Sequence, residues 1–435
     1  MAAALLIWLL SNHLRQMAHP KADVAHPVQP YGVVGTFWAS GVAVRHGLNP
    51  HAEYPQTWRP HAFTKDGPVI LDVNLNPPAL LPLFSFISRF RLFDIARTWE
   101  CLSTLLVLGV TGLMVWRYRP APNQVWWLLT GGALIGTFTL QQIYTLLFVL
   151  AVGAYWLLEE EHDLAAGIFL GVLCAAKPNF GLWPVVLALT GRRKPLLSAS
   201  AVFAILSMIP ALLYGVGVYG EWIRALGVDT HSIFPSDVTF TGNAARLGAR
   251  PLGIILSIAV LSLTCFAVSV GKPRLRDASG MAICAAILCS PLAWMHYLLV
   301  LVPVLLSRRW TRKELVAAWL LWINPVFLEP DNPGVSHWNL AVRGLVYLVP
   351  FLILFADFAR EPFHKLWVNF ARPRAISEGP LGPRRAAGWG PILAEARGPG
   401  SFTSSSGSNG TPRSPQAYDI TKRTHQLEGG AQRDA

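Results

Sequence analysis

The stretch NLNPPALLPLF, Asn74 to Phe84, follows a polar loop rich in histidine and proline and precedes a series of apolar segments. Its three prolines would interrupt a simple spanning helix, because proline lacks a backbone N–H and restricts the residue before it. Hydrocarbon tolerates irregular backbone only where protein or a water-filled cavity satisfies the exposed polar groups. We therefore expect the stretch to line a cavity at one membrane face, with Asn76 among the residues that bind a substrate there.

The composition predicts an all-α integral membrane protein. Of the 435 residues, 53% are hydrophobic and 14% are charged, whereas soluble domains carry about 25% charged residues. The mean hydropathy is +0.40, and the 17 tryptophans suit the interfaces of a bilayer. We expect a polytopic bundle of about 10 to 12 transmembrane helices behind a large first extracytoplasmic loop.

The net charge of +12 does not indicate nucleic-acid binding, because the basic residues form short clusters between apolar runs. Such clusters are typical of cytoplasmic loops under the positive-inside rule. The clusters are Arg117 with Arg119, Arg192 to Lys194, Lys272 with Arg274 and Arg276, and Arg308 to Lys313. The five cysteines all fall in apolar stretches and form no CxxC pair, so we interpret them as small buried hydrophobic residues.

Four regions follow from the hydropathy pattern. Residues 1–18 are a first transmembrane segment, 19–98 an extracytoplasmic loop with a re-entrant or interfacial helix, and 99–357 the multi-span domain. Residues 358–435 are a basic cytoplasmic tail, rich in Gly, Ser and Pro, which we expect to be disordered. Within the multi-span domain, EEEHD (Glu159 to Asp163) and KPN (Lys177 to Asn179) are expected to form tight hairpin turns.

A parity count orients the chain in the plasma membrane. With the N-terminus inside, all four basic clusters lie inside, provided that residues 74–92 do not fully cross the bilayer. The acidic residues Glu159 to Glu161 are discordant, since they fall on the same inner side. The hairpin at Lys177 then faces outward.

Polar residues of several loops are expected at this outer face. Acids and cations beside a lipid phase suit a substrate that has a phosphate and an apolar tail, since a cation holds the phosphate and an acid deprotonates an incoming hydroxyl. The polar residues expected at this face are Asp23, Glu53, Asp66, Asp72, Gln141, Gln142, Tyr144, Lys177, Glu221, Arg224, Asp229, His231, Asp237, Asn243, Arg246, Arg250, Trp294 and His296. The substrate-binding candidates among them are Gln141, Lys177, Asn243, Arg246, Arg250 and His296. Arg246 and Arg250 are four residues apart, which predicts that they share one helical face.

Each candidate also has a simpler interpretation. Lys177 can extend its charge to the interface from a helix end, Gln141 can be a turn residue, and the two arginines can mark a solvated helix end. The loop histidines lack metal-ligand spacing, so we expect no metal site and no cofactor. P-loop, GxSxG and HExxH motifs are absent from the sequence, which argues against ATP-driven, serine-hydrolase and zinc-protease functions.

Six motifs, in order, resemble the glycosyltransferase family 87 group of bacterial membrane proteins, which have the GT-C architecture. They cover most of residues 31–357. The motifs are FWASGVAVRHGLNPHAEY (Phe37 to Tyr54), NLNPPALLPLF (Asn74 to Phe84), LQQIYTLLFVL (Leu140 to Leu150), AAGIFLGVLCAAKPNFGLWPVVL (Ala165 to Leu187), TGNAARLGAR (Thr241 to Arg250) and SPLAWMHYLLVLVP (Ser290 to Pro303).

The resemblance implies a GT-C-like fold and an enzyme that uses a polyprenyl-phosphate sugar, often mannose, as donor. The sugar would pass to a lipid or glycan acceptor on the extracytoplasmic side, with inversion. An acid in the first outer loop would act as the base, and a cation would stabilise the leaving polyprenyl phosphate. Lys177 matches the Lys-Pro motif of the family and is the natural candidate for that cation, together with Arg246 or Arg250.

The sequence departs from the family at one position. Family members usually have an aspartate four residues before the Phe-Trp pair, where this chain has Val33. Asp72 or Asp23 would have to act as the base instead. Two other functions stay open: a transporter or flippase of lipid-linked sugar, and an inactive relative that serves as an assembly partner.

Overall fold

The computed structural model describes residues 32–52, 74–229, 236–323 and 336–371. Asp23, Asp72, the expected first span and most of the expected tail lie outside these ranges. All described residues belong to one structural unit, residues 1–373. They form helices joined by short turns, with one isolated β-bridge between Asp237 and Trp294. Helices satisfy their own backbone polar groups, which is the requirement of an apolar surrounding.

The proline-rich stretch forms two short helical turns. A 3-10 helix, η1 (Pro78–Leu80), leads directly into α4 (Leu81–Ile87). Pro78 and Pro82 both lie in the first turn of their helix, where a backbone N–H would have no helical partner. Ten residues of helix extend about 15 Å, whereas the hydrocarbon core is about 30 Å thick. This element is therefore too short to cross a bilayer.

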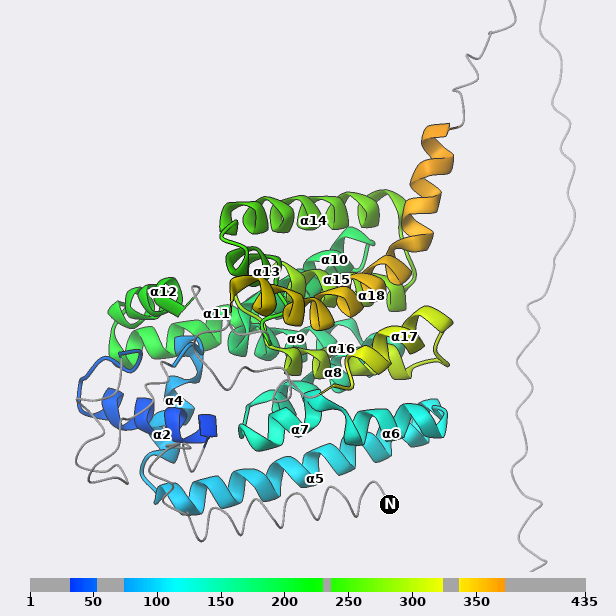
Figure 1. Ribbon diagram of the computed structural model, residues 1–435. Coiled ribbons are helices and arrows are strands. Elements are labelled where there is room, and N and C mark those ends of the chain that lie inside the picture. Colours follow the sequence, from blue (N-terminus) through cyan, green and yellow to red (C-terminus); the bar gives the residue numbers. More distant parts are fainter. Residues whose placement is uncertain (1–31, 53–73, 230–235, 324–335, 372–435) are drawn as a thin grey trace, which may run out of the picture. The chain divides into compact units, whose positions relative to one another are not determined.

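Helix α2 (Gly32–Arg45) packs closely against α4. The rings of Phe37 and Phe84 stack with centroids 4.6 Å apart and an interplanar angle of 5°. A Cβ atom on Gly41 would lie 1.9 Å from the carbonyl oxygen of Phe84. The two helices thus approach to backbone contact at Gly41, which joins two segments that are distant in sequence (Figure 1).

Among the residues that the structure describes, four helices are long and apolar enough to cross a membrane. They are α5 (Leu92–Tyr118), α11 (Arg193–Tyr214), α14 (Arg250–Gly271) and α18 (His337–Ala371). The long helices expose large aliphatic side chains, such as Leu197 and Leu212 of α11, at 67% and 78%. Surfaces of this kind are expected to face lipid. The chain is an all-α membrane protein.

Shorter apolar helices form the interior. They are α8 (Tyr144–Glu159), α9 (Asp163–Ala176), α10 (Leu182–Leu189), α15 (Leu275–Leu288) and α16 (Leu298–Leu306). Every residue of α16 is buried, as is every residue of α15 from Ala278 onward. Figure 1 also shows the remaining elements, α6 (Pro122–Thr130), α7 (Gly132–Thr139), α12 (Gly217–Asp229), α13 (Phe240–Arg246) and α17 (Arg312–Leu320).

The acidic hairpin between α8 and α9 is neutralised by basic residues at the same end of the bundle. Arg117 pairs with Glu160, and the Tyr118 hydroxyl donates to Glu159 over 2.7 Å. Arg192 donates from Nε to Asp163 over 3.0 Å. Of the acids that do not fit the polarity rule, Glu160 is thus a partner of a basic cluster. We call this end of the helices the ion-paired end.

A second charged network lies at the same end, where α15 begins and α16 is followed by α17. Arg276 pairs with the fully buried Glu314, which also caps α17 through Thr311. Arg308 lies 3.6 Å from Glu314 and 3.8 Å from Asp357 of α18. These contacts connect α15, α17 and α18 through opposite charges.

Gly41→Ala is expected to destabilise the protein by about 1–3 kcal/mol, because the added methyl group would overlap the Phe84 carbonyl. Thermal unfolding in detergent measures the change. Gly112→Ala in α5 is the matched control, since a Cβ there meets nothing within 4 Å and alanine favours the helix. Equal unfolding temperatures for the Gly41→Ala and wild-type proteins would contradict the close approach of α2 and α4.

Candidate functional site

Lys177 lies where the chain leaves α9 and enters η2 (Pro178–Gly181). Its backbone is extended, with φ −147° and ψ 92°, because a residue before proline avoids the helical conformation. The Lys-Pro pair thus ends α9. It directs the ammonium group toward two aromatic rings, with Nζ 5.8 Å from the ring centre of Tyr144 and 5.7 Å from that of Tyr297.

Three aromatic rings form the wall beside this ammonium. Tyr144 begins α8, and His296 and Tyr297 belong to η3 (Met295–Tyr297), just before α16. The Tyr144 ring centre lies 4.5 Å from that of His296 and 4.8 Å from that of Tyr297. All three side chains are buried. Nε2 of His296 has no hydrogen-bond partner among the described residues. We call Lys177, Tyr144, His296 and Tyr297 the lysine cluster.

The environment of Lys177 lowers the pKa of its ammonium group. Burial lowers the pKa of its ammonium to about 8, compared with about 10.4 for an ordinary lysine. At neutral pH the group still carries its charge in most molecules. The faces of aromatic rings attract cations, so the cluster holds a positive charge in surroundings poor in water.

A buried aspartate connects the lysine cluster to α13. Asp237 accepts hydrogen bonds from the amides of Thr239 and Ala293, over 3.0 and 3.4 Å, and the Val238 amide donates to the Ala293 carbonyl. This pairing fixes the chain that leads to His296. Burial raises the pKa of Asp237 to about 6, against the opposing effects of its hydrogen bonds and of Arg246.

Arg246 connects α13 to the chain at Asp237 and to α18. Its side chain is fully buried and donates from Nη2 to the Asp237 carbonyl over 2.9 Å. A Cβ on Gly344 of α18 would lie 2.2 Å from the same nitrogen. The guanidinium group therefore fills the space between α13 and α18.

The prediction that Arg246 and Arg250 share one helical face is wrong. Helix α13 ends at Arg246, Gly248 follows with φ 70°, and α14 begins at Arg250. A positive φ breaks the helical register, and glycine adopts it at little cost. Arg250 is partly exposed at the start of α14, whereas Arg246 faces inward.

Asn243 and Asn76, which we predicted to bind substrate, both form hydrogen bonds that stabilise local turns. Asn243 donates to the Thr239 carbonyl over 2.8 Å, while its Oδ1 has no partner among the described residues. The backbone amide and the Nδ2 of Asn76 both donate to Oδ1 of Asn74 over 3.0 Å. Nδ1 of His51 lies 2.7 Å from the Asn74 carbonyl. Asn76 thus helps to shape the entry to η1.

Gln141 is buried at the junction of α7 and α8. Its Nε2 donates to Oε1 of Glu100, in α5, over 2.8 Å. The Val33 amide donates to the neighbouring Leu140 carbonyl over 2.9 Å. The residue in place of the family aspartate therefore lies beside this junction.

The structure brings Lys177 and His296 into one cluster and places Asn243 and Arg246 in the adjoining α13 segment. Gln141 precedes Tyr144 by three residues, and Asn76 lies in the separate η1 turn. Glu100 was not among the residues predicted from the sequence, and Tyr144 and Asp237 were predicted to lie at the outer face without a role. Glu100 stands at the start of an apolar run that carries no other charged residue up to Trp116, and this was the available signal.

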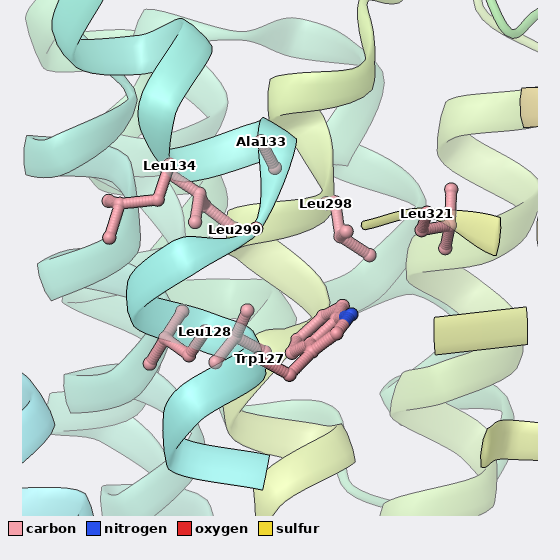
Figure 2. Close-up of a pocket in the computed structure, with 9 residues that line it drawn as sticks. Trp127, Leu128, Ala133, Leu134, Leu298, Leu299 and Leu321 are labelled. Carbon is pink, nitrogen blue, oxygen red and sulfur yellow. The ribbon is translucent and has the colours of Figure 1, made fainter. Parts of the chain in front are cut away.

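A small cavity at the break between α6 and α7 is too small to hold a sugar. Its volume is about 10 Å³, close to the minimum for one water molecule. Figure 2 shows aliphatic side chains around it, with the Trp127 indole at one side. Within the described ranges, no group of three or more His, Cys, Asp or Glu residues is arranged to hold a metal ion.

Comparison with protein families identifies the chain. The model of glycosyltransferase family 87 matches residues 74–322, which is more than half of the 435 residues. The chain therefore belongs to glycosyltransferase family 87 and is a glycosyltransferase. The match contains the lysine cluster, Glu100 and Gln141, whereas α2 precedes it. No curated protein and no solved structure matches the chain.

Acylation of Lys177 by an amine-specific reagent is expected to reach half its limiting rate near pH 8 in the folded protein. In the denatured protein, acylation of the same residue should reach half its limiting rate near pH 10.4, because the pKa of an ordinary lysine is about 10.4. Mass spectrometry of the peptide that contains Lys177 measures both rates. If the acylation midpoints of the folded and denatured proteins coincide, the Lys177 ammonium is exposed to water and the prediction is wrong.

Proposed function

We propose that this glycosyltransferase takes a sugar, most simply mannose, from a polyprenyl-phosphate donor. It transfers the sugar to a lipid or glycan acceptor at the extracytoplasmic face of the plasma membrane. The observation that carries the proposal is the lysine cluster, in which the Lys177 ammonium lies 5.7–5.8 Å from two tyrosine ring centres. The cluster lies at the end of α9 remote from the ion-paired end.

A phosphate with an isoprenoid tail matches the two properties of this end. A cation in water-poor surroundings attracts an anion more strongly than the same cation in bulk water. The apolar surface of the neighbouring long helices suits a tail that stays in the bilayer. Arg250 is the more accessible second cation, because Arg246 is engaged inside the bundle.

The distribution of charge supports the proposed orientation. The basic clusters at the ends of α5 and α16, and at the starts of α11 and α15, all lie at the ion-paired end. The positive-inside rule favours a cytoplasmic position for such clusters. The lysine cluster, at the opposite ends of α9 and α16, then faces the extracytoplasmic side.

In the proposed reaction, Asp72 or Asp23 takes the proton from an acceptor hydroxyl. The acceptor oxygen attacks the anomeric carbon as the bond from that carbon to the phosphate oxygen breaks. The electron pair of the broken bond leaves with the polyprenyl phosphate, whose charge Lys177 stabilises. One displacement inverts the configuration at the anomeric carbon.

The alternative of a transporter or flippase has less support. Transporter sites lie near the middle of the bilayer, between two structural repeats, whereas Lys177 lies at a helix end. An inactive assembly partner is the third candidate, and Val33 is the observation that favours it. Purified protein with a labelled polyprenyl-phosphate sugar separates the three, because only the transferase forms product and only the flippase moves the label across vesicles.

Asp72→Asn is expected to abolish transfer while leaving the unfolding temperature unchanged, because the amide keeps the shape but accepts no proton. Turnover of a labelled polyprenyl-phosphate mannose with a lipid-extract acceptor measures the effect. Asp66→Asn, in the same loop, is the matched control and should retain activity. Wild-type turnover in Asp72→Asn protein, with loss in Asp23→Asn, would assign the base to Asp23. Full activity in both variants would remove both assignments.

A further inference from the structure

The end of α7 has an unusual residue in a common type of turn. The amide of Gln142 donates to the Thr137 carbonyl over 2.9 Å, and the amide of Gln141 donates to the Phe138 carbonyl over 3.1 Å. Gln141 has φ 50°. These are the bonds of a Schellman motif, in which glycine usually takes the left-handed position. Here a glutamine takes it.

Gln141 differs from the other non-glycine residues with positive φ in the described ranges. Arg119, Glu161 and Lys272 are exposed, whereas Gln141 is 2% exposed. A left-handed conformation costs free energy for any residue with a Cβ atom, and glycine avoids that cost. The hydrogen bond from the Gln141 side chain to Glu100 is one interaction that offsets this cost.

Glu100 is equally unusual in its own helix. It is 2% exposed within α5, a helix long enough to span a membrane. A buried ionisable side chain is costly in such surroundings and commonly marks a functional site. Its bond from Gln141 comes from a neutral amide, which orients the carboxylate. One turn further, Ser103 and Thr145 join α5 to α8 through hydroxyl groups 3.0 Å apart.

The junction determines where α8 begins, and with it the position of Tyr144. Ile143 is the N-cap of α8 and Tyr144 its first residue, three residues after Gln141. The Tyr144 ring contacts His296, Tyr297 and the Lys177 ammonium. A shift at Gln141 would therefore move the ring that faces Lys177.

We propose that Glu100 is a positioning residue, which holds the start of α8 through Gln141 and so places the Tyr144 ring against the Lys177 ammonium. Its consequence for sugar transfer rests on the proposed function, whereas the effect on Lys177 does not. The competing interpretation is a simple structural brace, which would change stability without changing the lysine cluster.

Two variants break the contact in different ways. Glu100→Ala removes the acceptor. Gln141→Gly removes the donor but suits the positive φ, so the turn should survive. Glu100→Gln is the rescue variant, because its side-chain oxygen still accepts the hydrogen bond. Ser103→Ala is the matched control, since it breaks a neighbouring hydrogen bond, from α5 to Thr145 of α8, and leaves Gln141 untouched.

The first readout is the pH at which Lys177 acylation is half-maximal in the folded protein. The charged and titratable groups at the ammonium are Tyr144, Tyr297 and His296. In Glu100→Ala and Gln141→Gly proteins the midpoint should rise by about one pH unit as the site admits water. The Glu100→Gln and Ser103→Ala proteins should keep the wild-type midpoint.

The second readout is transfer from the labelled polyprenyl-phosphate sugar. The donor KM should rise about tenfold in Glu100→Ala and Gln141→Gly, with a smaller change in kcat and no loss of unfolding temperature in Gln141→Gly. A wild-type midpoint and KM in both variants would overturn the proposal, as would a Glu100→Gln protein that behaves like Glu100→Ala. If wild-type protein transfers no sugar but the midpoints still shift, the proposed function fails and the positioning role of Glu100 stands.

Discussion

A lysine ammonium can lie inside an apolar bundle only where its surroundings replace part of the water that it loses. Here two tyrosine rings do so, 5.7 and 5.8 Å from Nζ of Lys177. The rings come from the starts of α8 and α16, and the lysine from the end of α9. Each of these ends is fixed by its own local feature: the Schellman motif at Gln141, the Asp237 pairing before His296, and the Lys-Pro break.

At the ion-paired end of the bundle, charged side chains have partners of opposite charge. There, acids and bases pair directly, as Arg276 and Arg308 do around Glu314, and the pairs connect α15, α17 and α18. Paired charges satisfy one another and hold helices together, whereas the charge of Lys177 faces aromatic rings. This difference, rather than the number of charged residues, distinguishes the ion-paired end from the end at which we propose that a phosphate binds. The proposed role of Glu100 is to keep the lysine cluster at that second end in place.

Local sequence patterns predicted much of the fold. The hairpins at Glu159 and Lys177 occur where the sequence placed them, because acidic runs and Lys-Pro pairs stop helices through local sterics and solvation. The sequence also identified Lys177 and His296, which both lie against the ring of Tyr144. It failed for Arg246 and Arg250, because the spacing rule assumes a continuous helix and Gly248 interrupts it. It did not select Glu100, since the partner that explains this acid lies 41 residues away, at Gln141.

The central claim is that the lysine cluster and the ion-paired end lie on opposite sides of the membrane, with the cluster outside. Single cysteines in a background without the five native cysteines test it most directly. Leu140, 45% exposed beside Gln141, and Arg309, exposed after α16, are suitable positions for Leu140→Cys and Arg309→Cys. A membrane-impermeant maleimide on intact spheroplasts should label the first and reach the second only after lysis. Labelling of Arg309→Cys in intact spheroplasts, with protection of Leu140→Cys, would contradict the account.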